Sequence, residues 1–298
     1  MSQTIGPVTT QKGPVCFAGG VGPVYGPGTQ SFVLDQLSSY PTVAFSVRQL
    51  TANPLYVRPY CMLVRRSSDN ATLNIGYVNG LLDIVSLLAF CGSGNGYVVT
   101  WYNQGYLGSS ADATQSTAAS QPQIVASGVV ETQNGVPTVY FGGSQSLTFS
   151  GYAVSANNTA YAVAYQYTSG GAVSHGIFGG GVGSIELQTA SGQVSLNKTN
   201  LSQVITLSGV TNRLNVYAVS GSNAGTKIIV SGISATNSTA ISPSASTNNI
   251  GLGNTADAEY QIGGISEVAL GNFAASLSDT TTYDLNAAAF YGITGVTQ

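Results

Sequence analysis

The sequence predicts an all-β protein, a two-sheet antiparallel sandwich with two short helices. Many short runs of β-branched and aromatic residues are separated by Gly, Asn and Ser, at a spacing typical of sandwiches. Only residues 83–91 and 279–291 show helical spacing. Hydrophobic residues make up 43% of the chain and charged residues 6%, which favours a buried core over disorder. With 298 residues and no internal repeat, we expect one sandwich domain over residues 32–298.

Residues 1–31 form a separate N-terminal arm in this prediction. The arm contains four Gly-Pro pairs, at positions 6–7, 13–14, 22–23 and 26–27. Such pairs disfavour helix, and the few large apolar residues between them are too dispersed for a core. We therefore expect an extended arm that docks on neighbouring subunits. The alternative, that it folds back on its own domain, stays open.

The first half of the sandwich begins with a helical turn at 35–39 and a weakly alternating strand at 44–50. Residues 60–66 predict a strand with two arginines at its end. A helix is expected next, because apolar residues recur at i, i+3, i+4 and i+7 from Ile84 to Cys91. Asp83 suits its N-terminus.

Gly92 should end this helix, and the run 97–102 then reads as a buried strand. Trp101 lies inside that run and is expected in the core. The pair Asn134-Gly135 predicts a hairpin in which 129–132 pairs with 137–141. Further strands are expected at 146–149, 160–167, 175–178, 184–187, 194–196, 204–207, 213–220 and 226–231.

The closing helix, 279–291, has Ser278 as its expected N-cap and Gly292 as its stop. Its apolar residues, including Tyr283 and Ala287, fall on one face. The helix should therefore pack one face against the sandwich.

Several motifs carry a resemblance: 64–69 (VRRSSD), 74–76 (NIG), 101–104 (WYNQ), 111–115 (ADATQ) and 121–122 (QP). They resemble the catalytic domain of the α-L-arabinofuranosidase B family, a jelly roll of the concanavalin-like lectin/glucanase type. Residues 250–253 and 260–270 are similar to the end of laminin-G-like and pentraxin-like jelly rolls. The resemblance implies a jelly-roll topology. Relatives of this domain also occur in phage and bacterial surface proteins.

Glycoside hydrolysis needs two carboxylates that flank one bond. The resemblance places the family nucleophile at Glu186 and the family acid in the late glycine-rich turn, 251–257. The acid position falls on Asn254 or Thr255, which cannot donate a proton, and Asp257 serves only if the loop shifts. Asn103 also replaces a family aspartate. We therefore predict no catalysis, with Glu186 and Asp257 as the catalytic pair if the chain is a hydrolase.

Charged residues elsewhere give candidate glycan-binding positions: Arg65, Arg66, Asp69, Asp112 and Asn254. The competing hypothesis for the first four is an ion-pair network that holds the loops, because buried charges must be paired. His175 is the single histidine, which excludes a Ser-His-Asp triad and a multi-histidine metal site in one chain. No cofactor or metal is expected, although the Asp and Asn residues at 254–259 leave calcium open.

Charge and cysteine content exclude several protein classes. The net charge is −3 with no basic patch, so nucleic-acid binding is not expected. No apolar run has the length of a membrane span, and residues 1–7 do not look like a signal peptide. Cys16, Cys61 and Cys91 are odd in number and widely spaced, which predicts free, buried thiols.

Together these observations predict a structural protein of a tailed-phage virion, made in the host cytoplasm. It would be a head-decoration or tail-fibre subunit, a homo-oligomer and preferably a trimer, joined to other virion proteins through its arm. Its lectin-like sandwich would carry a candidate surface for host glycans and no catalytic activity. The alternatives are an arabinofuranosidase-like glycoside hydrolase and a stand-alone carbohydrate-binding module.

Overall fold

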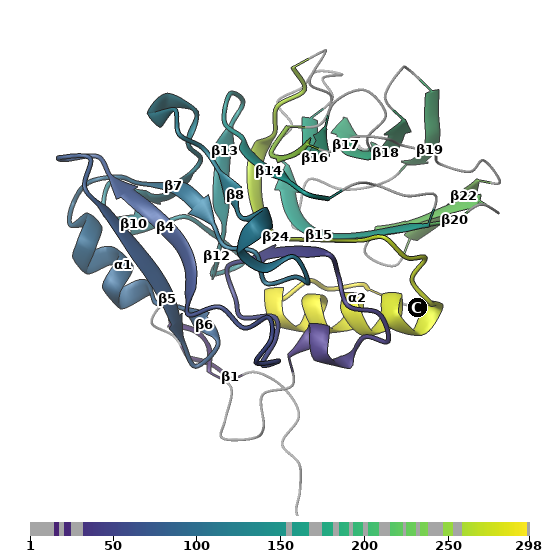
Figure 1. The fold of residues 1–298 in the computed structure, drawn as a ribbon, viewed down its shortest axis with the longest axis horizontal. Helices are drawn as coiled ribbons and strands as arrows, with labels where there is room; N and C mark the ends of the chain where they lie inside the picture. Colours follow the sequence, from purple (N-terminus) through teal and green to yellow (C-terminus); the bar gives the residue numbers. More distant parts are fainter. Residues whose placement is uncertain are drawn as a thin grey trace, which may run out of the picture.

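The structure is a computed structural model. It describes residues 15–17, 21–24, 32–152, 157–166, 175–180, 185–190, 193–198, 202–208, 215–222, 225–230, 233–237, 247–252 and 258–296. The chain is mostly β, and the pairings between described strands are antiparallel (Figure 1). An all-β antiparallel sandwich is therefore confirmed, while the jelly-roll connectivity stays a prediction.

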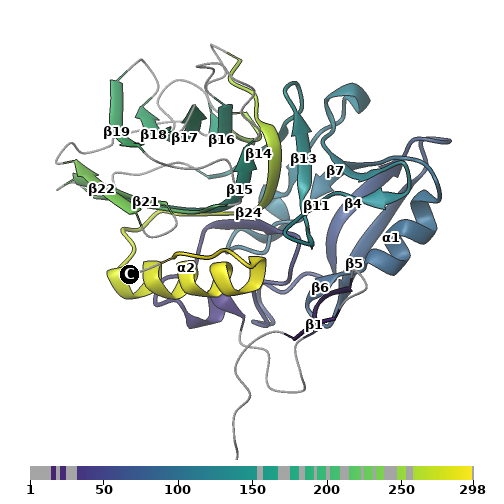
Figure 2. The same cartoon turned by 180° about the vertical axis from the view of Figure 1, so that it is seen from behind.

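Two layers of strands face each other, as Figures 1 and 2 show. The first layer contains β22 (Ile233–Asn237), β21 (Gly225–Val230), β20 (Asn215–Ser222), β15 (Asn158–Gln166) and β24 (Ile262–Gly271), with β3 (Val43–Ser46) and β13 (Val139–Gly142) sharing the far edge of β24. The second contains β19 (Ser202–Ser208), β18 (Gln193–Lys198), β17 (Ile185–Ala190), β16 (His175–Gly180), β23 (Thr247–Ile250) and β14 (Leu147–Ser150).

The second layer continues into strands from the first half of the chain. These are β8 (Ala113–Thr114), β7 (Gly96–Trp101), β4 (Tyr60–Arg66), β5 (Thr72–Val78) and β6 (Leu81–Leu82). Strand β9 (Gln123–Ala126) pairs with both β7 and β13 and so joins the two layers. Short 3₁₀ turns lie at η1 (Val33–Gln36), η2 (Gly108–Ala111) and η3 (Ala118–Ser120). The strand predicted at 60–66 is confirmed.

The expected hairpin at Asn134-Gly135 forms, but it is shorter than predicted. Both residues have positive φ, +50° and +76°, as a type I′ turn requires. Only β11 (Thr132–Gln133) and β12 (Val136–Pro137) pair across it. The flanking residues pair with other strands: β10 (Val129–Val130) pairs with β9, and β13 pairs with β24. The predicted pairing of 129–132 with 137–141 is therefore confirmed only next to the turn, where Thr132 pairs with Pro137 and the Thr138 amide donates to the Glu131 carbonyl at 2.9 Å. It is wrong for the outer residues.

Helix α1 (Ile84–Cys91) has the predicted ends. The Asp83 carboxylate accepts a hydrogen bond from the Ser86 backbone amide at 3.0 Å, and Gly92 follows the last turn with φ +58°. Leu87 and Cys91 are its buried residues. The helix therefore covers one side of the sheet edge formed by β4 and β5 (Figure 1).

Helix α2 (Leu277–Tyr291) lies against the face of the first layer that points away from the second layer (Figure 1). Its N-cap is Ser276, whose hydroxyl accepts a hydrogen bond from the Asp279 amide at 3.0 Å, so the predicted cap at Ser278 is wrong. Gly292 ends it in the left-handed conformation, as predicted. Tyr283 stacks on Tyr161 of β15 with ring centroids 4.1 Å apart, which fixes the helix to the sheet.

The core contains Trp101, which is fully buried and donates its indole N–H to the Ser46 carbonyl at 3.1 Å. This confirms its expected core position. Cys61 and Cys91 are free and buried, as predicted, and only the backbone of Cys16 is described. Within the part that the structure describes, no helix has the length and apolar character needed to cross a membrane.

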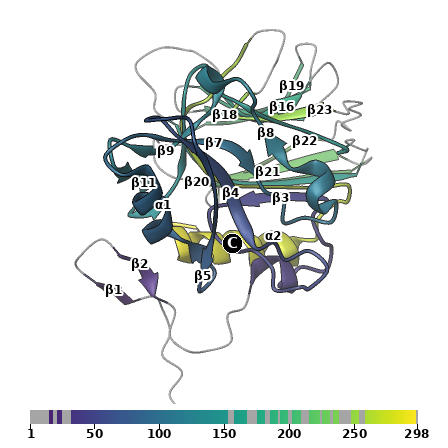
Figure 3. The same ribbon diagram turned by 60° about the vertical axis from the view of Figure 1, so that its left-hand side comes forward.

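Part of the N-terminal arm is paired. Strands β1 (Val15–Phe17) and β2 (Val21–Val24) form a two-stranded antiparallel ribbon, drawn below α1 and to the left of β5 in Figure 3. The remainder of residues 1–31 lies outside the described residues. The assembly role of the arm stays a prediction.

A buried ion pair joins β24 to the segment that follows β3. The Arg48 Nε lies 2.8 Å from the Glu267 Oε2, and both side chains are almost fully buried. Glu267 also accepts hydrogen bonds from the hydroxyls of Tyr283 at 2.5 Å and Tyr291 at 3.0 Å, and from Ser46 at 2.8 Å. The carboxylate thus ties two sheet strands to α2.

The buried tyrosines predict an alkaline limit to stability. Burial, with the Glu267 carboxylate adding to it, raises the pKa of Tyr283 and Tyr291 well above the usual 10.0. Below pH 10 both folded and unfolded chains keep these protons, but above it only the unfolded chain loses them. The free energy of unfolding should fall by about 1.4 kcal/mol per tyrosine per pH unit above about pH 10.

Urea denaturation at pH 8 to 11 measures this effect. Tyr283→Phe should reduce the alkaline slope, because phenylalanine has no proton to lose. A free energy of unfolding that stays constant up to pH 11 would contradict the prediction.

Candidate functional site

The predicted nucleophile, Glu186, belongs to the second layer, close to the strand that leads into the late turn. Strand β17 carries Glu186, β16 lies beside it, and β23 lies on the other side of β16. The register sets Phe178 of β16 against Leu187 of β17 and against Ile250 of β23. Two strand spacings amount to about 10 Å, so Glu186 lies within about that distance of the strand that leads into the late turn.

The late turn is closed by hydrogen bonds at its base. The Gly251 amide donates to the Ile177 carbonyl at 2.8 Å, and the Gln261 amide donates to the Gly251 carbonyl at 2.8 Å. Leu252 and Tyr260 form an isolated β-bridge. The Gly176 amide donates to the Glu259 carbonyl at 3.0 Å, so both ends of the turn are fastened to β16.

Not all of the predicted catalytic residues can be placed. The structure describes the backbone of Glu186 and of His175, on β17 and β16. Asn254, Thr255 and Asp257 lie outside the described residues. The register therefore brings the strand of Glu186 near the base of the turn, and the acid is not located.

Gly251 is required at the base of the turn for two physical reasons. Its φ is +79°, a conformation that L side chains rarely adopt, and an added Cβ would overlap the Phe141 ring. Gly251→Ala should lower the free energy of unfolding by about 2–4 kcal/mol, the sum of backbone strain and overpacking. Urea denaturation at neutral pH measures this loss.

Gly292→Ala is the matched control for Gly251→Ala. Gly292 has φ +63°, but an added Cβ there meets nothing within 4 Å. Its replacement should cost only the backbone strain, about 1 kcal/mol. Equal losses in the two variants would contradict the role assigned to Phe141.

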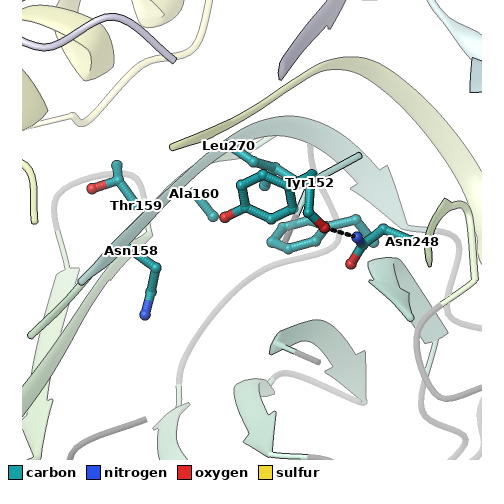
Figure 4. A pocket seen from close by; sticks show the side chains of 7 residues that line it. Tyr152, Asn158, Thr159, Ala160, Asn248 and Leu270 are labelled. Atoms are coloured by element: carbon teal, nitrogen blue, oxygen red, sulfur yellow. Dashed lines mark hydrogen bonds between the residues drawn. The ribbon is translucent and has the colours of Figure 1, made fainter. Parts of the chain in front are cut away.

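A small cavity lies between the two layers, and Figure 4 shows its lining. Tyr152, Phe178 and Leu270 contribute apolar walls, while Asn248 donates a hydrogen bond to the Tyr152 carbonyl at 3.0 Å. Its volume of about 10 Å³ suffices for one water at most. The cavity is therefore a feature of the core and too small for a sugar.

The four charged residues predicted to cluster lie in two separate places. Arg65 and Arg66, adjacent on β4, point to opposite faces of the sheet. The Arg65 guanidinium donates to the Gln121 Oε1 at 2.7 Å and to the Asn70 Oδ1 at 2.8 Å, and it stacks on Tyr97 at 4.8 Å. It therefore holds the β4–β5 turn against the 118–121 segment.

Arg66 forms a paired contact with Asp69 across the same turn. Its Nε and Nη2 donate to the two carboxylate oxygens at 2.8 and 2.7 Å. This hydrogen bonding, with the charge of Arg66, holds the pKa of Asp69 far below its usual range. The Arg66 Nη1 also donates to the Phe90 carbonyl at the end of α1, at 3.1 Å. The pair thus ties the turn to the helix.

Asp112 is bound to a different arginine, which the sequence prediction missed. Its Oδ2 lies 3.1 Å from the Arg58 Nη2, and its Oδ1 accepts the Asn103 amide at 2.8 Å. Burial raises the pKa of Asp112, and these two partners partly offset the rise. Arg58 also lies over the Tyr102 ring at 5.3 Å. The predicted ion pairs that hold the loops therefore form, but in two separate places, because Asp112 pairs with Arg58 and not with Arg65 or Arg66.

Asn103 has a defined structural role at the position where the resembling family has an aspartate. Its Oδ1 accepts the Ala44 amide at 2.7 Å and the Gly105 amide at 2.8 Å, and its Nδ2 donates to the Gly108 carbonyl at 3.0 Å. The side chain is fully buried. Among the described residues no group of three or more His, Cys, Asp or Glu side chains is placed to hold a metal ion.

Comparison with known proteins gives matches in structure but not in sequence. No protein-family model matches the sequence, and no curated protein matches it. An arabinofuranosidase complexed with arabinofuranosyl-α-1,2-xylobiose is similar in fold, with a TM-score of 0.67 and 16% identity over 87% of this chain. A GH54 α-L-arabinofuranosidase soaked with a cyclic sulfate inhibitor has a TM-score of 0.64 at 15% identity over the same share.

The chain spans 64% of the length of each of these arabinofuranosidase structures. A likeness at this identity establishes the fold alone, which is a β-sandwich like that of these arabinofuranosidases. The prediction of a non-catalytic tailed-phage virion protein is wrong, because the structures that the chain matches are glycoside hydrolases. The low charge and the arm rich in Gly and Pro indicated an assembly protein. Neither feature reports on whether the fold carries a catalytic site, because function depends on the residues of the site.

Proposed function

We propose that this chain is a carbohydrate-active domain that hydrolyses α-L-arabinofuranosides. The observation that carries the proposal is the likeness in fold, over 87% of the chain, to α-L-arabinofuranosidases. The position of Glu186 supports it, since β17 lies two strands from the glycine-rich turn in which the resembling family has its acid.

In this proposal Glu186 is the nucleophile and a carboxylic acid at the late turn protonates the leaving group. Retaining glycosidases use two carboxyl groups about 5–5.5 Å apart. The backbones of β17 and of the strand that leads into the turn are about 10 Å apart. Two side chains that extend toward each other across this gap would bring their carboxyl groups to the required distance. Asp257 is the candidate acid, because Asn254 and Thr255 cannot give up a proton at neutral pH.

Release of 4-nitrophenol from 4-nitrophenyl α-L-arabinofuranoside tests the proposal. Turnover by the purified chain, with retention of configuration at the anomeric carbon, is the expected result. Absence of turnover on this substrate and on arabinose-substituted xylan would overturn it. Saturable binding of the same sugars without turnover would instead indicate a carbohydrate-binding module.

A further inference from the structure

The outer face of the second layer, which points away from the first layer, carries a continuous row of polar side chains. Thr148 of β14 pairs with Thr114 of β8 on one side and with Asn249 of β23 on the other. Thr114 pairs in turn with Thr100 of β7. We call these four residues the polar row. Side chains at directly paired positions lie about 4.5–5.5 Å apart, so each member of the row contacts the next.

The orientation of the polar row follows from the residues that flank it. Successive side chains of a strand point to opposite faces of the sheet. Trp101 and Phe149 face the first layer, where their rings lie 6.3 and 5.2 Å from the ring of Phe45 on β3. Thr100 and Thr148, which precede them, therefore point to the outer face. The other two members share that face, because directly paired residues point to the same side of a sheet.

The polar row leads toward the predicted nucleophile. Asn249 pairs with Gly179 of β16. The register of β16 against β17, continued by one residue beyond Phe178, sets Gly179 opposite Glu186. Five strand spacings, about 24 Å, therefore separate Thr100 from the backbone of Glu186. The strands can be followed from β7 through β8 and β14 to β16 and β17 in Figure 1. This length suits several linked sugar residues better than a monosaccharide.

Exposure falls along the polar row toward Glu186. Thr114 is exposed, Thr148 is half-buried, and Asn249 is only 8% exposed. The Thr148 hydroxyl donates to the Asn249 Oδ1 at 2.7 Å, which fixes both side chains before a ligand arrives. The open part of the row suits the main chain of a polymer, and the covered part next to β16 suits a single branching sugar.

The chemistry of the polar row favours a neutral ligand that is rich in hydroxyl groups. None of its four side chains is ionisable, whereas nucleic acids and acidic polymers need Lys or Arg. Protein interfaces are enriched in Tyr, Trp, Phe, Met and Arg, and the row contains none of these. Threonine hydroxyls and asparagine amides both donate and accept hydrogen bonds, as sugar hydroxyls do.

From this arrangement we infer that the polar row binds the main chain of a neutral, arabinose-substituted polysaccharide. An arabinofuranosyl branch on that chain reaches the position of Glu186, at the covered end of the row. The choice of an arabinose-substituted chain rests on the proposed function. The choice of a neutral polysaccharide rests on the residues of the row and on their continuity with Glu186.

Affinity gel electrophoresis tests this inference, with Glu186→Gln present throughout so that hydrolysis does not interfere. This chain should be retarded by soluble arabinoxylan and not by polygalacturonate, which is acidic. Thr100→Val/Thr114→Val removes two hydroxyls but keeps the β-branched shape. It should weaken arabinoxylan binding about tenfold, because two neutral hydrogen bonds are lost. Thr100→Ser/Thr114→Ser keeps both hydroxyls and should retain the binding. Thr132→Val, at an exposed position on β11, is the matched control and should leave binding unchanged.

Four outcomes would overturn the inference: no retardation by arabinoxylan, equal retardation by polygalacturonate, equal binding after the two valine substitutions, or equal weakening by Thr132→Val. Circular dichroism shows whether the double valine variant is folded. If it is not, Thr114→Val alone, at the exposed position, gives the same test with an expected weakening of about threefold.

The inference and the proposed function fail in different experiments. Arabinoxylan binding that depends on the polar row, in an unaltered chain that does not turn over 4-nitrophenyl α-L-arabinofuranoside, would overturn only the proposed function. Turnover of that small substrate without any arabinoxylan binding would overturn only the role of the polar row.

Discussion

Glu186→Gln is expected to abolish hydrolysis of 4-nitrophenyl α-L-arabinofuranoside, lowering kcat by about a thousandfold or more. The physical reason is that the proposed nucleophile attacks the anomeric carbon through a carboxylate oxygen. A neutral amide of nearly the same size fills the same space but is a poor nucleophile. The circular dichroism spectrum and thermal midpoint should stay unchanged, since only one charge is removed.

Glu131→Gln is the matched control for Glu186→Gln. Glu131 is a half-buried carboxylate near β9 and β10, away from β17, and its removal should leave turnover intact. Azide added to Glu186→Ala offers a second readout, because a small anion in the vacated space can take over the attack. Full activity in Glu186→Gln would assign the nucleophile to another residue.

Glu267→Gln is expected to lower the free energy of unfolding by about 3–5 kcal/mol. In the unaltered chain the Arg48 Nε and Nη2 donate to the Glu267 carboxylate at 2.8 and 3.1 Å. The substitution leaves the buried Arg48 guanidinium without this counter-charge. Urea denaturation at pH 7 measures the loss. In the Glu267→Gln background, Arg48→Met should cost much less than it does alone, because the pair is already broken.

Asp69→Asn is the comparison for the buried pair. It breaks the ion pair of Arg66 and Asp69, whose side chains are 33% and 49% exposed, so solvent compensates and stability should change little. If Asp69→Asn destabilises the fold as much as Glu267→Gln does, burial is not what makes the Arg48–Glu267 pair important.

The Arg48–Glu267 pair also predicts a response to acid. Burial alone would raise the pKa of Glu267, but Arg48 and the hydrogen bonds from Tyr283 and Ser46 bring it below the usual 4.5. A carboxyl group with a lowered pKa stabilises the fold fully above that value, and the contribution is lost as pH falls through the folded pKa. The unaltered chain should therefore lose more stability below pH 4.5 than Glu267→Gln does.

Local patterns in the sequence determined a large part of the fold. The strand 60–66, the helix after Asp83 and its stop at Gly92 are placed as predicted, because capping, periodicity and turn chemistry act between residues a few positions apart. The core position of Trp101 follows from its apolar neighbours. The likeness to arabinofuranosidases was also readable in short motifs, although the function drawn from composition was wrong.

Only the tertiary structure decided which distant residues meet. Arg48 and Glu267 are 219 positions apart, and no local pattern relates them. Asp112 pairs with Arg58 and not with Arg65 or Arg66, because the loop after β7 lies beside the loop before β4. The pairing of β13 with β24 in place of its sequence neighbour has the same origin. Long-range hydrogen bonds and ion pairs depend on how the layers are stacked, and that arrangement is a property of the whole chain.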